Sequence, residues 1–315
     1  MLDAKRLRVL REVAARGSFS AAAEALSYTQ SAVSQQIATL EREAGTILLD
    51  RGARGIRLTD AGRALVEHAD AILARLAAAE AELEAIAGLR GGRVRIASFP
   101  TVGATLVPVA VAEFTRAHPD VELSLVEAEP EESIPRLKSG EIEIALSFEY
   151  ATLPRAVYEP LREGIELRHL LDDPMYLALH PDHPLAHRPD VRLADLEGEA
   201  WIQGDPAGLC GAMHRHACQS AGFEPRVGFE SDDYNVVQGL VAAGVAISLL
   251  PMLALTNVRD DIVIRSLGPE TPVRRVSAST ASGAYRSPAT EAMLEILVDA
   301  GRRYAAQRRD LAVAS

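Results

Sequence analysis

The chain has 315 residues, of which 48% are hydrophobic and 24% are charged, so it carries enough apolar material for two or three folded domains. This composition excludes a disordered, collagen-like or low-complexity chain. Two cysteines are too few for a disulfide framework, and no apolar stretch reaches the roughly 18 residues of a membrane span. The N-terminus has no apolar secretory segment, so we expect a cytoplasmic protein that does not bind membranes.

The net charge of −11 is unevenly distributed along the chain. Residues 1–65 carry ten basic and seven acidic side chains, residues 66–90 carry two and five, and residues 91–315 carry 21 and 32. The chain is therefore a weakly basic head on an acidic body. An excess of three positive charges does not by itself identify a nucleic-acid-binding domain, so that assignment depends on the pattern of the first 60 residues.

These 60 residues predict three short helices. Gly17 ends the first helix, and Ser18 or Ser20 caps the second, which is rich in alanine and covers about residues 19–26. Thr29 is the expected N-cap of a third helix that Gly45 ends. One side of the third helix is apolar at helical spacing and consists of Val33, Ile37, Leu40 and Ala44.

The opposite side of the third helix is polar at its N-terminus and holds Gln30, Ser31, Ser34 and Gln35. Two helices joined by a tight turn, the second buried on one side and polar on the other, are typical of a helix-turn-helix. A helix N-terminus favours phosphate, glutamine can pair with adenine, and serine can contact bases or backbone. The alternative is an ordinary solvated helix face, since glutamine and serine are common surface residues.

A glycine-rich hairpin is expected at residues 47–58, with Arg51, Arg54 and Arg57 near its tip. An arginine-bearing hairpin beside a helix-turn-helix is a winged arrangement, whose arginines can contact phosphates or a narrow minor groove.

A long helix follows from about residue 60 to 87, with Thr59 as its cap. Such a helix spans roughly 40 Å at 1.5 Å per residue. Its apolar side chains recur in heptads, which predicts a two-stranded dimer contact; packing against its own chain is the alternative. The expected contact residues are Leu65, Ile72, Leu76, Leu83 and Ile86, with Ala69 and Ala79 between them. Gly88, Gly91 and Gly92 then predict a flexible joint.

Beyond residue 93 the pattern alternates between strands and helices. Strands are expected at 93–97, 121–127, 142–148, 167–180, 227–230, 245–249 and 273–280. Helices are expected at 101–118, 131–139, 207–221, 232–243 and 287–309. This order predicts a largely parallel α/β sheet and two lobes of about 100 residues with a cleft between them.

The chain resembles the LysR-type transcriptional regulators over essentially its whole length. The resemblance is strongest in the head, in the segments 17–26 (GSFSAAAEAL) and 29–37 (TQSAVSQQI), and continues in the wing at 48–51 and 58–62. In the body it rests on 183–186 (HPLA), Trp201-Ile202 and 240–251 (LVAAGVAISLLP). Leu49-Asp50 stands where the family often has Phe-Glu, and Ser31 where it often has Pro.

The resemblance implies a winged helix-turn-helix at 1–58, a linker and dimerisation helix with its joint at 59–90, and an effector-binding domain at 91–315. That domain would resemble a type 2 periplasmic solute-binding protein, with one lobe from about 91–161 plus 267–315 and the other from about 162–266. The implied protein binds promoter DNA as a homodimer or homotetramer and responds to a small molecule, without a cofactor. RNA polymerase is a further partner that the resemblance suggests.

The resemblance also implies the site residues. The DNA-binding surface would consist of Thr29, Gln30, Ser31, Ser34, Gln35, Arg51 and Arg54. The effector site would be lined by Ser98, Phe99, Thr101, Ser147, Gln203 and Asp232. A strand end that leads into a helix N-terminus favours carboxylates, so we expect a carboxylate effector near Ser98 and Thr101; a helix cap without a ligand role is the alternative.

A second constellation offers a different sensing chemistry. Cys210, His214 and Cys218 share one face of an expected helix, which could present sulfur and imidazole to a metal or to an oxidant. Some LysR-type members sense peroxide with a cysteine pair in this region. An unbroken helix would separate the two sulfurs by about 12 Å, too far for a disulfide, and two semi-buried cysteines in an ordinary helix are the simpler interpretation.

No enzyme signature occurs in the chain, neither a nucleophile elbow, a P-loop, a dinucleotide fingerprint nor a zinc-protease motif. We therefore expect no catalytic residues and no resident metal. A solute-binding protein for transport would share the body fold but would not need residues 1–90.

Overall fold

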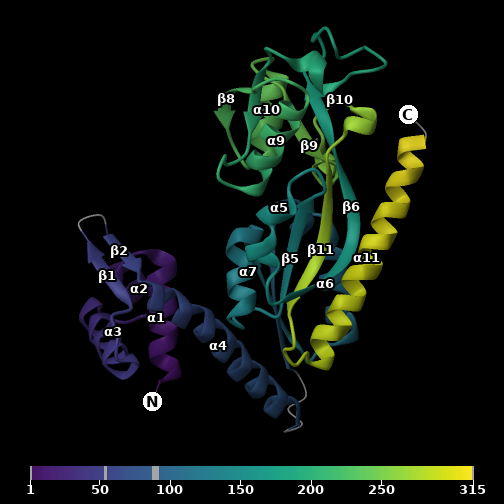
Figure 1. The fold of residues 1–315 in the computed structure, drawn as a ribbon. Coiled ribbons are helices and arrows are strands. Elements are labelled where there is room, and N and C mark those ends of the chain that lie inside the picture. Colours follow the sequence, from purple (N-terminus) through teal and green to yellow (C-terminus); the bar gives the residue numbers. More distant parts are fainter. Residues whose placement is uncertain (1, 53–54, 87–91, 314–315) are drawn as a thin grey trace.

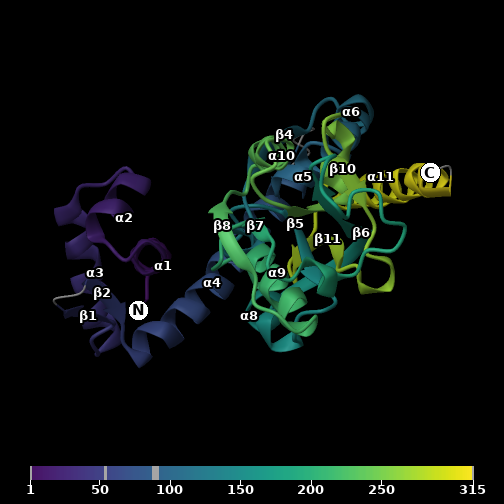
Figure 2. The ribbon, with the colours of Figure 1, turned by 90° about the horizontal axis from the view of Figure 1, so that it is seen from above.

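A computed structural model describes residues 2–52, 55–86 and 92–313. Figures 1 and 2 show a small helical head and a larger α/β body, joined by one long helix. Among the described helices, none combines the length and apolar character needed to cross a membrane.

The head begins with the three expected helices, α1 (Ala4–Arg16), α2 (Phe19–Ala25) and α3 (Gln30–Ala44). The sequence signals act as predicted. Ser18 caps α2 and Thr29 caps α3 through side-chain oxygens that accept backbone N–H groups. Gly17 and Gly45 end α1 and α3 with φ of 62° and 70°, a conformation that glycine adopts without strain.

The wing consists of β1 (Leu49–Gly52) and β2 (Gly55–Leu58), which pair in antiparallel fashion. It is fixed to the helices at both sides. The Glu41 carboxylate accepts the N–H groups of Leu48 and Leu49 at 2.9 and 3.2 Å. The Thr59 hydroxyl donates to the Ile47 carbonyl at 2.8 Å and accepts the Gly62 N–H at 3.0 Å, which caps the next helix.

That helix is α4 (Asp60–Ile86). Its first turns pack against the head, because Ala69 is fully buried and Leu65 lies against the apolar cluster of α1–α3. Leu65 is therefore partly buried against the head of the same chain, and its role in a dimer contact stays a prediction. Ile72, Leu76 and Leu83 are exposed by 40, 45 and 66% and form the uncovered part of the stripe. The predicted contact at Ile86 and the joint at Gly88 and Gly91 lie outside the described side chains and residues.

The body contains a seven-stranded sheet. Its order is β10 (Val263–Arg265), β6 (Ile165–Leu179), β11 (Val273–Ala281), β5 (Ile144–Tyr150), β3 (Arg93–Ser98) and β4 (Glu122–Glu127), with β9 (Ser248–Pro251) also paired to β6. Only β4, β3 and β5 are mutually parallel, whereas β11, β9 and β10 pair in antiparallel fashion. The expected largely parallel sheet is thus wrong for its second half.

The helices of the body cover this sheet and build the second lobe. They are α5 (Pro100–Gly103), α6 (Leu106–Ala117), α7 (Pro130–Lys138), α8 (Glu159–Arg162), α9 (Leu209–Ser220), α10 (Tyr234–Ala242) and α11 (Pro288–Val313). Short 3-10 turns lie at Arg155–Val157, Leu193–Leu196, Met252–Asn257 and Gly268–Glu270. A separate parallel pair, β7 (Ala200–Gln203) and β8 (Arg226–Glu230), lies beside α9 and α10 (Figure 1).

The fifteen residues of β6 connect the two lobes. Ile165 to Pro174 pair with β11, and Met175 to Leu179 pair with β9 and β10. One buried apolar cluster accordingly runs through both lobes, from Phe114 on α6 to Trp201 on β7. The fold is the expected two-lobed α/β body behind a winged helix-turn-helix.

Several boundaries differ from the expectation. The helix expected at 101–118 is divided into α5 and α6, and the Thr105 hydroxyl donates to the Thr101 carbonyl at the break. The strand expected at 245–249 begins at Ser248. Strands β7 and β10 were not predicted, because each has only three or four residues and too little length for a clear period.

Candidate functional site

The N-terminal face of α3 is the first candidate surface. Thr29, Gln30, Ser31 and Gln35 are exposed, and Ser34 is half-buried. The Thr29 Oγ1 accepts the Ala32 N–H at 3.2 Å and lies 3.0 Å from the Ser31 Oγ, so these two hydroxyls are ordered before any ligand arrives. Polar side chains at a free helix N-terminus can hydrogen-bond to base edges and phosphates.

The orientation of this face is fixed from behind. Val33, Ile37 and Leu40 are completely buried against α1 and α2. Ala22 and Ala23 are small, so α2 can lie close to α3. The side chain of Arg51 and residue Arg54 lie outside the described part of the wing, and their DNA-binding role stays a prediction.

The second candidate site is a cavity on the second lobe where that lobe meets the first. Its volume is about 30 Å³, and its polar walls are Gln203, Cys210, His214, Ser231, Asp232 and Tyr234. A cavity of this size holds one or two water molecules. Of the predicted effector residues, the structure brings Gln203 and Asp232 together here.

The other predicted effector residues lie elsewhere. Ser98 and Phe99 are buried, and the Ser98 hydroxyl donates to the Phe99 carbonyl at 3.1 Å. The hydroxyl oxygens of Ser147 on β5 and Ser279 on β11 lie 2.7 Å apart and share a hydrogen bond. Thr101 accepts a hydrogen bond from Arg274 at 2.7 Å. The hydroxyls of Ser98, Thr101 and Ser147 have internal partners, and neither they nor Phe99 line the cavity, so their contact with an effector stays a prediction.

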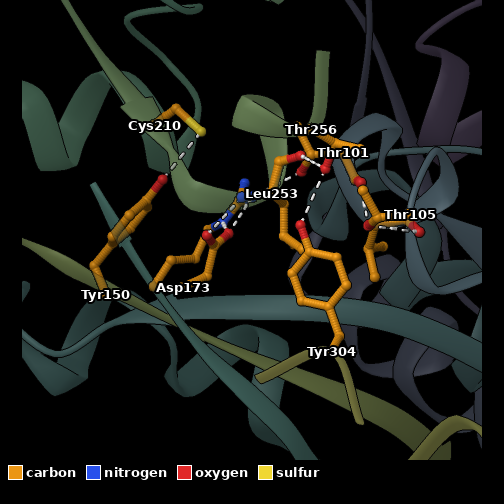
Figure 3. Close-up of polar contacts among 10 residues, drawn as sticks. Thr101, Thr105, Tyr150, Asp173, Cys210, Leu253, Thr256 and Tyr304 are labelled. Carbon is orange, nitrogen blue, oxygen red and sulfur yellow. Dashed lines mark hydrogen bonds and ion pairs between the residues drawn. The ribbon is translucent and has the colours of Figure 1, made fainter. Parts of the chain in front are cut away.

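A buried ion pair joins β11 to β6 next to Thr101 and Phe99 (Figure 3). The sequence did not predict it. Arg274 on β11 donates to the Asp173 carboxylate on β6 at 2.6 and 2.9 Å, and both side chains are at most 2% exposed. The guanidinium lies 4.8 Å from the ring centres of Phe99 and Phe148. The second Asp173 oxygen accepts the Leu253 N–H from the second lobe at 3.0 Å.

Sequence signals for this pair were partial. Along β11, Arg274, Val276 and Ala278 alternate as buried residues, so strand period alone predicts that Arg274 points inward. A buried arginine requires an acidic partner. Nothing local identifies Asp173 as that partner, because it is 101 residues away.

Two polar contacts join the lobes beside the cavity. The Tyr150 hydroxyl lies 3.4 Å from the Cys210 sulfur (Figure 3). The Glu131 carboxylate accepts the Leu209 N–H at 2.9 Å. Burial of the Glu129 carboxyl disfavours its charged form and raises its pKa to about 7, although the positive charge of Arg274 acts in the opposite direction.

The Cys210, His214 and Cys218 side chains do not converge on one point. His214 Nδ1 lies 3.0 Å from the Gln203 Oε1, and its Nε2 lies 3.8 Å from the Cys218 sulfur, while Cys210 contacts Tyr150. Burial lowers the pKa of His214 to about 4 and raises those of Cys210 and Cys218 to about 11 and 12. Within the described ranges no group of three or more His, Cys, Asp or Glu side chains could hold a metal ion.

Both candidate sites lie in parts of the chain that match families of known proteins. Residues 4–63 match the family profile described as the bacterial regulatory helix-turn-helix protein, lysR family, and residues 87–302 match that of the LysR substrate binding domain. The hydrogen peroxide-inducible genes activator of Dickeya chrysanthemi is 30% identical over 278 residues, 88% of each chain. The probable HTH-type transcriptional regulator LrrA of Synechococcus elongatus is 30% identical and covers 94% of this chain and 96% of its own.

Solved structures agree with these matches. CbnR, a LysR family transcriptional regulator, superposes with a TM-score of 0.58 at 25% identity, over 95% of this chain and 99% of CbnR. A cysteine-to-aspartate variant of full-length OxyR from Pseudomonas aeruginosa superposes with a TM-score of 0.63 at 22% identity, over 96 and 95% of the two chains. Both superpositions extend over nearly the whole chain and so include the head, the linker helix and the body.

Proposed function

Since this chain belongs to the LysR family of transcriptional regulators, DNA-binding proteins with an effector-binding domain, we propose which of its own residues bind DNA and effector. The members it matches are regulators and not enzymes. Operator DNA binds the N-terminal face of α3 and the β1–β2 wing, and a small molecule bound at the second-lobe cavity, beside the contact with the first lobe, controls that binding.

One observation carries the DNA-binding part of this proposal. The exposed side chains of Gln30 and Gln35 stand at the N-terminal end of α3, directly opposite a stripe that is completely buried. A helix held so firmly from behind presents its polar face without a large loss of conformational entropy on binding. A helix with such an exposed polar face suits insertion into a major groove.

The test is a gel-shift titration of the full chain against the DNA upstream of its own coding region and against scrambled DNA. The double variant Gln30→Ala/Gln35→Ala is expected to lose about 1–3 kcal/mol of discrimination per lost base contact. Gln219→Ala on α9, distant from the head, serves as control. An unchanged ratio between the two DNAs in the double variant would remove α3 from the proposal.

The exposed stripe of α4 supports an oligomer. Ile72, Leu76 and Leu83 are large apolar side chains on one uncovered helix, and pairing of two α4 helices would remove them from water. We propose a homodimer through this stripe and a homotetramer through further body contacts. Promoter-bound RNA polymerase is the proposed downstream partner.

The size of the cavity defines how the effector binds. About 30 Å³ admits one or two waters, so we expect a larger effector to displace the cavity walls, Cys210 among them, and thereby to loosen the Tyr150–Cys210 contact with the first lobe. A carboxylate is the proposed class, because the Gln203 amide and the Tyr234 hydroxyl on the cavity wall can donate hydrogen bonds to it. Arg274 adds no net charge, since Asp173 is paired with it. Asp232 and Glu131 oppose an anion, but Glu129 with its pKa of about 7 is protonated in about half of the molecules at neutral pH.

A thermal-shift screen of the full chain tests the effector class. Small carboxylates are compared with their amides and with the corresponding amines, because a ligand that binds only the folded state raises the melting temperature. The effect is expected to fall in Gln203→Leu and to persist in Asp260→Asn, an exposed control. If the amines stabilise and the carboxylates do not, the carboxylate proposal is wrong and Asp232 becomes the anchor.

Redox sensing through Cys210 is the second candidate function. It is favoured by the position of Cys210 on the wall of a cavity of peroxide size, and by relatives described as hydrogen peroxide-inducible genes activators. The raised pKa of Cys210, about 11, disfavours the reactive thiolate. Mass spectrometry after mild peroxide treatment decides between the two: oxidation of Cys210 ahead of Cys218 supports sensing, and two unmodified thiols exclude it.

A further inference from the structure

Helix α7 and the turn that follows it contact both the second lobe and the DNA-binding part of the chain. Figure 1 shows α7 on the side of the body that faces α4. We propose that α7 is the element that couples the contact between the lobes to the position of the linker helix and the head. This inference rests on the proposed function, because it takes the interlobe cavity as the effector site.

At its N-terminal end α7 caps a helix of the other lobe. The Glu131 carboxylate accepts the backbone N–H of Leu209, the first residue of α9, at 2.9 Å. The N-cap residue of α9 is Gly208, which has no side-chain acceptor of its own. Four N–H groups at a helix start lack partners within the helix, so α9 depends on Glu131 for one of them. Separation of the lobes must break this bond or pull α7 with it.

At its C-terminal end α7 leads into a turn that touches α4. Gly140 has a φ of 72°, and a Cβ atom there would stand 2.8 Å from the Ala77 Cβ and 3.3 Å from the Ala74 Cα. The turn therefore lies so close to α4 that no room is left for a Cβ atom, and glycine is required at this position. The next residue, Glu141, pairs with Arg11 of α1 in the head and lies 3.5 Å from Arg136 of α7.

The segment between these ends is firmly packed. Ile134 and Leu137 are 1% exposed, and Ser133 is completely buried against the body. The Lys138 ammonium donates to the Pro160 carbonyl at 2.8 Å. Nine helical residues span about 13 Å, and although Pro135 lacks one helical N–H donor, buried side chains on both sides of it hold α7 against the body as one unit. A displacement of one end is therefore passed to the other.

The physical consequence is a shared equilibrium. An effector that binds better to separated lobes removes the Glu131 acceptor from α9 and frees α7 to shift. The Gly140–Ala77 and Glu141–Arg11 contacts then change together, and with them the direction of α4 and the head. Because a coupling free energy is reciprocal, a disturbance at α4 must also loosen the start of α9.

Hydrogen exchange of the full chain, without DNA or effector, tests this coupling in both directions. From the linker side, Gly140→Ala introduces the Cβ that collides with Ala77. Gly198→Ala is its matched control, since Gly198 also has a positive φ, 85°, but no atom within 4 Å of its Cβ position. Ala77→Gly, alone and combined with Gly140→Ala, removes the collision. From the lobe side, Glu131→Ala is compared with Glu127→Ala, an exposed carboxylate at the end of β4.

The expected result is that Gly140→Ala accelerates exchange in the peptide covering 205–213 about fivefold, the factor that corresponds to roughly 1 kcal/mol of opening free energy, and that Ala77→Gly restores it. Glu131→Ala is expected to accelerate exchange in α4 around residues 70–80, whereas both controls behave as the parent. Effects confined to the mutated end, or seen in one direction only, overturn the proposal. Because neither DNA nor effector is used, such a failure leaves the DNA-binding and effector-binding proposals untouched.

Discussion

Replacement of Arg274 by methionine removes one half of the buried ion pair and leaves the other half in place. Asp173 is 0% exposed, and without Arg274 it loses both charge-assisted bonds and keeps backbone N–H donors alone, among them Leu253 at 3.0 Å. The loss of one partner of a buried pair costs about 3–5 kcal/mol, because the remaining charge stays desolvated. Against a domain stability of roughly 5–15 kcal/mol, this is a large fraction.

The chain provides its own assay for this change. Its single tryptophan, Trp201, is fully buried in the same apolar cluster as Phe99 and Val276. Urea unfolding followed by tryptophan fluorescence therefore reports the body and not the head, which avoids mixing two transitions. Arg275→Met, the exposed neighbour on β11, is the control and is expected to change the unfolding free energy by less than about 0.5 kcal/mol.

A double variant separates the charge from the packing. In Arg274→Met/Asp173→Leu no charge is left buried, so the unfolding free energy is expected to recover by more than half of the loss in Arg274→Met. A loss below about 1 kcal/mol in Arg274→Met would refute the argument that the pair is desolvated. An equal loss in the double variant would assign the effect to packing between Phe99 and Phe148 alone.

Three further outcomes are expected. Leu76→Asp places an unpaired charge on the exposed stripe of α4 and should abolish dimerisation through α4, measured by sedimentation velocity. His68→Asp on the same helix should leave the dimer intact. An intact oligomer in Leu76→Asp would exclude the stripe as the contact. Glu41→Ala frees the Leu48 and Leu49 N–H groups and should weaken binding to specific and scrambled DNA alike in a gel shift, because the wing loses its anchor; a loss for specific DNA alone would contradict this. His214 has a pKa of about 4 in the folded protein against 6.5 in the unfolded chain, so the unfolded chain takes up the proton first and stability falls as the pH drops from about 6.5 toward 4. In that window the urea unfolding free energy of the parent should fall by up to about 3 kcal/mol relative to that of His214→Asn. A difference between the two that does not change with pH would show that His214 is not desolvated.

The head could be predicted almost residue by residue because its signals are local. Gly17 and Gly45 end helices where glycine is required, and Ser18 and Thr29 cap the helices that follow them. Each of these choices involves atoms within a few residues of one another, so the sequence displays cause and consequence side by side.

The body could be predicted in outline but not in its site. The element order follows from periodicity, yet the antiparallel half of the sheet depends on where β11 returns after 100 residues. Arg274 finds Asp173, and Glu131 finds α9, over separations of 101 and 78 residues. Spacing carries no information on such pairs. For a related reason the heptads of α4 did not reveal that Leu65 packs against the head, since period alone does not say which partner covers an apolar face.

The small volume of the second-lobe cavity has a kinetic meaning for the proposed effector site. If an effector larger than one or two waters binds there, the cavity walls have to move apart first, so only the open fraction of the protein is competent to bind. At low effector concentration the observed rate of association then rises with concentration. At high concentration it levels off at the rate of lobe opening, and that rate sets the shortest time in which this regulator responds to its signal.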